Sequence, residues 1–111
     1  MILVNTTFSV DSSISADFID FIKETYLPLA ESSGFYAPLL TELRAPSEPD
    51  ADGNPQRTFA LQMRAPSQKT VTDFRNDILP HIYGSMSKLW GMKLALFEST
   101  LDVVHDPAKH N

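Results

Sequence analysis

Two helical apolar stripes, each between strand-like segments, limit the fold of this chain more than any other feature. The first stripe follows Asp11 and has the spacing of one helix face: Ile14, Phe18, Phe21, Ile22 and Leu29. The second follows Ser67, a predicted helix cap: Val71, Phe74, Ile78, Ile82, Met86 and Leu89. Pro28 predicts a kink in the first helix or the end of its regular part, and Pro80 predicts a kink in the second helix. Gly34 and Gly91 predict the helix ends.

Four segments that alternate apolar and polar residues predict strands at 1–10, 36–45, 57–65 and 92–104. Pro38 predicts an edge position or a bulge for the second strand. In the last strand we expect Ala95, Phe97, Leu101 and Val103 to face the helices, and Leu94, Leu96 and Glu98 to face away. The polar, proline-rich segment 46–56 predicts a long hairpin loop.

The element order therefore predicts an α+β domain of βαββαβ order, the ferredoxin-like fold. Its four-stranded antiparallel sheet carries two helices on one face. We expect residues 1–104 to form this single domain and residues 105–111 to form a flexible polar tail.

The second face of that sheet has no helix to cover it. We expect Leu3, Leu94 and Leu96 to leave an apolar patch there, with polar residues between them. A second copy of the chain is the simplest cover. Two sheets packed face to face would form a homodimer, a dimeric α/β barrel.

Composition excludes several classes of protein. The net charge of −5 and the scattered basic residues argue against binding to nucleic acid or to an anionic membrane. The chain has no cysteine, which excludes disulfides and thiolate sites. The sequence shows no signal peptide and no apolar stretch of about 20 residues. We therefore expect a cytoplasmic protein that needs no cofactor.

Several segments of the sequence resemble a known family. These are VNTTFSVD, SISADFIDFIKETYLP, Leu61-Gln62-Met63 and LWGMKLALFESTLDVV. With them the chain resembles an uncharacterised bacterial family of the dimeric α/β-barrel superfamily, which also holds the antibiotic-biosynthesis monooxygenases. The resemblance implies the fold and the dimer but no activity. In that family the residue two before the first helix proline is often histidine, whereas here it is Tyr26.

Three motifs suggest chemistry only weakly. Residues 48–53 have the early spacing of a calcium loop, but the twelfth position is Phe59 instead of glutamate. Ser85 and Lys88 match an S-x-x-K pattern without its partner motifs. The histidines His81, His105 and His110 lack the spacing of a metal site, so no metal is predicted.

The candidate site comprises polar residues expected between the two sheets: Asn5, Thr7, Gln62, Arg64 and Glu98. They either form a network that fixes the dimer register or bind a small ligand, with Tyr26, Tyr36, Tyr83 and Trp90 as possible lining. The favoured function is a non-enzymatic homodimer that binds a small molecule or protein partner. The alternatives are a cofactor-free oxygenase or isomerase with Glu98 as a candidate catalytic base, and a purely structural dimer.

Overall fold

The computed structural model describes residues 1–44 and 48–104, and it confirms the ferredoxin-like βαββαβ order. The strands are β1 (Ile2–Asp11), β2 (Tyr36–Glu42), β3 (Gln56–Ala65) and β4 (Leu94–Asp102). Between β1 and β2 lie α1 (Ser15–Phe21) and α2 (Leu27–Ser32). Between β3 and β4 lie α3 (Gln68–Asp77) and α4 (Leu79–Trp90).

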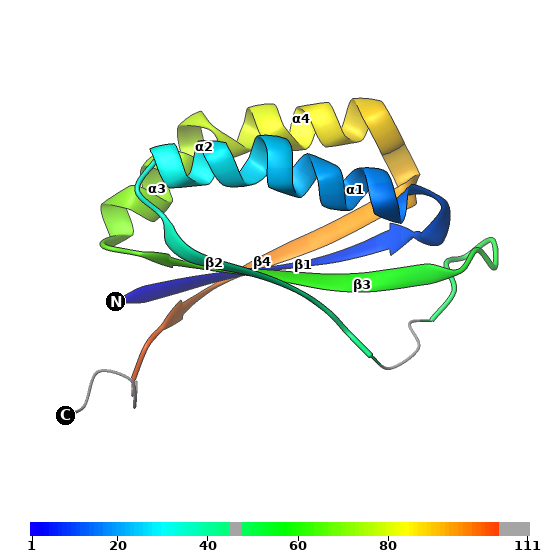
Figure 1. The fold of residues 1–111 in the computed structure, drawn as a ribbon, viewed down its shortest axis with the longest axis horizontal. Helices are drawn as coiled ribbons and strands as arrows, with labels where there is room; N and C mark the ends of the chain where they lie inside the picture. The colour runs from blue at the N-terminus through cyan, green and yellow to red at the C-terminus, as the bar shows by residue number, and fades with distance from the viewer. Residues whose placement is uncertain (45–47, 105–111) are drawn as a thin grey trace.

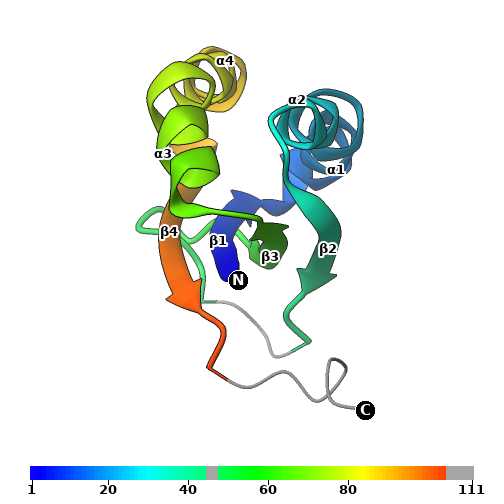
Figure 2. The ribbon, with the colours of Figure 1, turned by 90° about the vertical axis from the view of Figure 1, so that its left-hand side faces the viewer.

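The four strands form one antiparallel sheet below the helices (Figure 1), in the order β2-β3-β1-β4 (Figure 2). β2 and β4 are therefore its edges. All four helices lie above the same face, in two parallel rows, and no described helix covers the opposite face (Figure 2). We call the covered side the helix face and the other side the open face.

The first helical segment contains a π-helical turn between α1 and α2. This turn, η2 (Ile22–Tyr26), follows a short 3-10 turn, η1 (Ser12–Ile14), at the start of the segment. Leu27 N–H donates to Ile22 O, five residues back, just before Pro28, which has no N–H to donate. The extra residue rotates the apolar stripe, so Ala30 is buried and Leu29 is exposed. The prediction that Leu29 faces the core was wrong for this reason.

The second helical segment is divided where Pro80 predicted a kink. α3 and α4 are separate helices, because Ile78 leaves ordinary helical geometry with φ −112° and Pro80 lies in the first turn of α4. Ser67 caps α3, as predicted, by accepting a hydrogen bond from Thr70 N. Leu89 is 60% exposed, so its predicted place in the buried stripe was also wrong.

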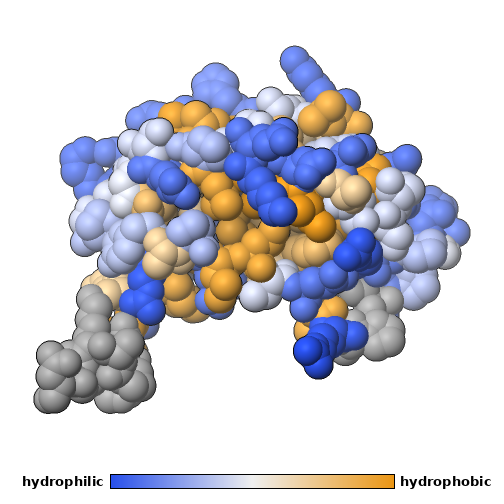
Figure 3. All heavy atoms as spheres, viewed as in Figure 1, coloured by the Kyte–Doolittle hydropathy of each residue, from blue (hydrophilic) through white to orange (hydrophobic). Residues whose placement is uncertain are grey.

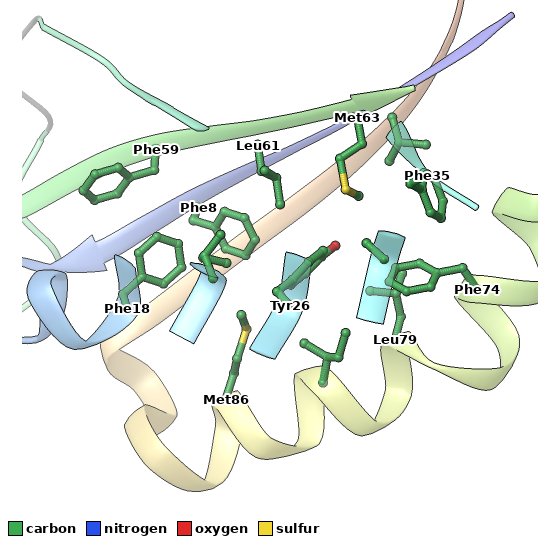
Figure 4. Packing of buried hydrophobic residues seen from close by; sticks show 14 of the residues in the cluster. Phe8, Phe18, Tyr26, Phe35, Phe59, Leu61, Met63, Phe74, Leu79 and Met86 are labelled. Atoms are coloured by element: carbon green, nitrogen blue, oxygen red, sulfur yellow. The ribbon is translucent and has the colours of Figure 1, made fainter. Parts of the chain in front are cut away.

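The core lies between the helices and the sheet, and it is rich in aromatic rings (Figure 4). Phe18 of α1 packs on Phe8 and Phe59, with ring centroids 4.9 and 5.3 Å apart. Tyr26 lies at the centre of the cluster, between the sheet and α4. The even residues of β1 and the odd residues of β3 supply the sheet side of this core, as their alternation predicted.

The prediction of which β4 residues face the helices was wrong. In the pairing with β1, Leu94 lies opposite Val10, Leu96 opposite Phe8 and Glu98 opposite Thr6. Directly opposed residues share a face, so these three lie on the helix face. Leu94 and Leu96 pack against the core. The odd residues Ala95, Phe97 and Leu101 lie on the open face instead.

The edge strand β2 is shorter than predicted, and it carries the irregularity that Pro38 suggested. Its register with β3 shifts between Tyr36 and Leu39, and Ala37 adopts a positive φ of 51°.

On the side that carries α1, α2 and β2, apolar side chains gather between the helices and the sheet (Figure 3). Leu29 of α2 and Leu39 of β2 are both exposed, and Leu39 lies on the open face, opposite Gln62.

Candidate functional site

The open face carries the predicted polar residues in two strands at its centre. Asn5 of β1 lies opposite Gln62 of β3 and, on its other side, opposite Ser99 of β4. The Asn5 amide donates to the Thr7 hydroxyl over 3.4 Å. Four of the predicted site residues are half-buried in the single chain: Asn5, Thr7, Gln62 and Arg64. The structure thus brings four of the five predicted site residues together, and their binding role stays a prediction.

Apolar side chains surround this polar centre. Phe97 and Leu101 of β4 are 61% and 45% exposed, and Leu39 of β2 is 56% exposed. Their strand partners are Thr7, Leu3 and Gln62, all residues of the open face. The result is a sheet surface with a polar middle and apolar margins on both edge strands.

Glu98, the fifth predicted site residue, lies on the opposite side of the sheet. The Arg75 guanidinium of α3 pairs with it: Nη2 contacts Glu98 Oε1, and Nε donates to the same oxygen over 3.2 Å. Arg75 Nη2 also donates to Thr100 Oγ1 over 2.9 Å. Glu98 therefore cannot act as a base between two sheets, because the sheet itself separates it from that space.

A pocket opens beside Glu98, between α4 and the edge strand β4. It has a volume of about 550 Å³, and six residues line it: Arg75, Leu79, Pro80, Tyr83, Leu96 and Glu98. α3 supplies the guanidinium, α4 the apolar wall and the phenol, and β4 the carboxylate. Glu98 and Leu79 also border the tightly filled space around Tyr26.

Three buried hydroxyl groups extend from this pocket into the core. Tyr26 and Thr6 have no exposed surface, and the Tyr83 oxygen is also buried. The Tyr26 hydroxyl has Thr6 and Tyr83 as neighbours, and Tyr83 has Glu98, yet none of the three hydroxyls completes a hydrogen bond. Buried hydroxyls without partners are unfavourable in a core, so they require an explanation.

Burial keeps both phenols protonated. Desolvation, followed by the negative charge of Glu98, raises the pKa of Tyr83 to about 12. Desolvation also raises the pKa of Tyr26 above its usual value. Both groups are therefore neutral hydrogen-bond donors at physiological pH.

Sequence reasoning missed Arg75 and the pocket as a unit, although a signal was present. Arg75, Leu79 and Tyr83 recur every four residues, the spacing that places side chains along one side of a helix. Pro80 interrupts this segment, yet the spacing survives the break between α3 and α4. This spacing predicts that the three side chains share one surface. Glu98 is recognised as part of that surface only when β4 is assigned the correct face.

The aromatic residues proposed as pocket lining separate into different places. Tyr26 and Tyr83 lie near Glu98, whereas Tyr36 pairs with Arg64 on the open face and is 41% exposed. Trp90 packs edge-on against Phe21 at the other end of α4, with ring centroids 5.5 Å apart. Of these four aromatic residues, only Tyr26 and Tyr83 therefore belong to a common site.

Within the part of the chain that the structure describes, the remaining sequence motifs form no shared centre. In the calcium-like loop, Asp50 accepts hydrogen bonds from Asp52 N and Asn54 N over 2.9 and 2.8 Å, so it closes a turn. Ser85, Lys88 and His81 are exposed on α4. His105 and His110 lie outside the described residues. Within 1–44 and 48–104, no group of three metal-binding side chains comes together. No helix in these ranges is long and apolar enough to span a membrane.

Solved structures show where this fold recurs. A dimeric ferredoxin-like protein from an uncultured marine organism has a TM-score of 0.65 at 9% identity, over 96% of this chain and 97% of its own. A second such protein, also from an uncultured marine organism, has a TM-score of 0.55 at 10% identity, over 95% and 97%. An ethyl tert-butyl ether D family protein from Bacillus halodurans has a TM-score of 0.57 at 15% identity, over 89% and 97%. At these identities the likeness concerns the fold alone.

Family comparison agrees with the fold and with the expectation of an uncharacterised family. Among curated proteins, none matches the chain significantly. A family model does match, over residues 1–104. Its description is "Domain of unknown function (DUF4286)", and the chain belongs to this family.

Proposed function

We propose that this chain works as a non-enzymatic homodimer that pairs through the open face of its sheet. One observation carries the proposal: Phe97, Leu101 and Leu39 expose about half of their side chains or more on the face that no described helix covers. Apolar patches of this kind on small soluble domains mark interaction surfaces. A second copy offers the same patch, and a two-fold interface is built from one patch used twice.

The corrected face of β4 strengthens this proposal. The sequence argument relied on Leu94 and Leu96, which the helices in fact cover. Phe97 and Leu101 take their place on the open face and present larger apolar surfaces at its edge. The need for a partner therefore survives, with different residues responsible for it.

The polar centre of the open face supports a specific pairing. Asn5, Gln62 and Ser99 lie side by side across three strands. Burial of these groups against a second sheet requires hydrogen bonds to the partner, and only a few relative positions of the two sheets supply them. Polar groups inside an interface fix its register in this way, at some cost in affinity.

The position of Glu98 favours a non-enzymatic role for the interface. A cofactor-free oxygenase or isomerase acting between the sheets needs a base there, and the carboxylate considered for that role lies on the helix face in a pair with Arg75. The two dimeric ferredoxin-like proteins of the same fold support the assembly by analogy. Dimerisation is common to the binding, enzymatic and structural alternatives.

The test is a charge placed on the open face. The variant Phe97→Glu and its control Leu89→Glu add the same carboxylate at positions that are 61% and 60% exposed. Leu89 lies on α4, away from the open face. Light scattering after size exclusion at micromolar concentration should give twice the chain mass for the wild type and Leu89→Glu, and one chain mass for Phe97→Glu, since burial of unpaired carboxylates is costly.

Two outcomes would overturn the proposal. The first is a wild-type protein that is monomeric at micromolar concentration. The second is a dimer that Leu89→Glu disrupts and Phe97→Glu leaves intact, because the interface would then involve α4 instead of the sheet.

A further inference from the structure

The open face has a hollow in the same row of residues as its exposed phenyl ring. The hollow has a volume of about 360 Å³, and four short side chains of β1, β2 and β3 are part of its lining: Thr7, Thr41, Thr58 and Ala60. In the strand pairing Ala60 lies opposite both Thr7 and Thr41, and Thr7 lies opposite Phe97 of β4. One row across the sheet therefore has a protruding ring at the β4 edge and short side chains on the other three strands.

The hollow suits an apolar group. Thr41 donates its hydroxyl to Ala60 O over 3.3 Å, and the Thr7 hydroxyl accepts from the Asn5 amide over 3.4 Å. These two hydroxyls have partners within the chain, and the Ala60 side chain has no polar atom. A cavity of about 150 Å³ in a protein core is already large enough to bind one benzene ring, so this hollow has room for a phenyl group.

The two edge strands carry inverse patterns of side-chain size on the open face. On β4 a large residue lies between two small ones: Ala95, Phe97 and Ser99. On β2 and the residue after it, a small residue lies between two large ones: Leu39, Thr41 and Leu43. The rows agree, because strand pairing places Phe97 in the row of Thr41 and Ser99 in the row of Leu39. A surface with this pattern is complementary to a second copy of itself.

The open face also carries none of the negative charge of the chain. The net charge is −5, which opposes contact between two copies through acidic surfaces. The four rows that contain Ala95, Phe97, Ser99 and Leu101 include one charged residue, Arg64. A second copy can therefore cover this face without burying carboxylates against one another.

We infer that, in the homodimer proposed above, the Phe97 ring of each copy inserts into the hollow of the other copy, over the partner's Ala60. The inference rests on that dimer and adds its arrangement. A two-fold axis along the central strands β1 and β3 places β4 of one copy over β2 and β3 of the other. Each large residue of one edge then meets a small residue of the opposing edge, and both rings are buried.

A two-fold axis across the strands would not fill the hollow with a ring. It would place β3 over the partner's β3, and the open-face residues of that strand are Thr58, Ala60, Gln62 and Arg64. Phe97 would then lie over the partner's β4 at the sheet edge. The two arrangements therefore differ in what the ring touches, which an experiment can measure.

The first test needs no substitution. Wild-type dimers are formed from equal amounts of isotope-labelled and unlabelled chains, and isotope-filtered NOE spectra then record only contacts between the two copies. We expect contacts between the Phe97 ring protons and the methyl groups of the partner's Ala60 and the partner's Thr41.

The second test exchanges the large and the small residue. Phe97→Ala and Ala60→Phe should each raise the dissociation constant of the dimer about 30-fold or more, because one removes the buried ring and the other fills the hollow. The double variant again pairs one large residue with one small residue, so its constant should return to within about 5-fold of the wild-type value. The control is Ala51→Phe, which adds the same ring at an exposed position between β2 and β3. Sedimentation equilibrium measures all four constants.

The outcomes separate this arrangement from the dimer itself. A wild type that is monomeric at micromolar concentration overturns the homodimer and the arrangement with it. A dimeric wild type whose Phe97 ring shows no contact with the partner's Ala60 or the partner's Thr41 overturns the arrangement alone. A double variant that dimerises no more tightly than Ala60→Phe does the same. If Ala60→Phe does not fold, the contacts in the wild type decide.

Discussion

The two faces of the same sheet differ in how deeply their side chains are buried and in which elements cover them. On β1 the even residues Val4, Thr6, Phe8 and Val10 are buried, while the odd residues Leu3, Asn5, Thr7 and Ser9 are half-buried. The helix face meets α1, η2, α2, α3 and α4 within the same chain. The open face meets nothing that the chain itself provides in the described residues.

This difference appears in the chemistry of each face. The helix face is filled by interlocking rings and aliphatic chains, where volume and shape decide the fit. The open face alternates amides and hydroxyls with exposed Phe97 and Leu101, which suits a partner that must be recognised as well as covered. One face therefore determines the stability of the monomer, and the other would determine association in the homodimer proposed above.

The largest expected effect separates the two faces directly. Phe8→Ala removes a fully buried ring that packs on Phe18 and should lower the free energy of unfolding by about 3–5 kcal/mol. Phe97→Ala removes a ring that is 61% exposed and should change monomer stability far less. Chemical denaturation at low protein concentration, where dimers dissociate, measures both values.

Equal losses for the two variants would contradict the comparison. They would mean that Phe97 already packs within one chain. A loss for Phe97→Ala that grows with protein concentration would instead sharpen it, because the ring would then stabilise the assembly.

The sequence predicted the element order, an edge position or a bulge for β2, and the helix face of β1 and β3. These depend on local signals: alternation in strands, helical stripes, and the restrictions that Pro38 and Pro80 impose on their backbones. They are specified by the segment itself, so a reader of the sequence can recover them.

The face of β4 could not be read in the same way, because this strand carries apolar residues on both sides. Leu94 and Leu96 on one side and Phe97 and Leu101 on the other satisfy either assignment. Only the pairing with β1 decides between them. For the same reason the pocket could not be predicted from the sequence, because Glu98 lies near Arg75 and Tyr83 only if it is on the helix face. The π turn was hidden as well, and it placed Leu29 outside.

The next largest expected effect on stability concerns the buried hydroxyl groups on the helix face. Tyr26→Phe removes a fully buried hydroxyl that has no hydrogen-bond partner, and it keeps the ring. We expect the free energy of unfolding to rise by about 1 kcal/mol, because an unpartnered hydroxyl costs more in the core than in water. Thermal or chemical denaturation checks this, with Tyr36→Phe on the open face as the control. A decrease would show that the Thr6, Tyr26 and Tyr83 hydroxyls bond to one another.

The smallest effect lies at the rim of the helix face, where Arg57 joins β3 to β2. Arg57 Nε and Nη2 donate to the two oxygens of Glu42 over 2.8 and 2.7 Å, and both side chains are 40% exposed. The hydrogen bonds from Arg57 lower the pKa of Glu42, so this group stabilises the fold above its unfolded pKa, about 4.3. That contribution disappears as pH falls through the lower folded pKa.

Denaturation of the wild type and Glu42→Gln between about pH 6 and pH 3 measures this contribution. The variant should lose a small part of the acid sensitivity and little stability at neutral pH, because exposed ion pairs contribute weakly. A large loss at neutral pH would show that the edge strand β2 depends on this pair. In that case the packing under the helices would not by itself hold the sheet edge in place.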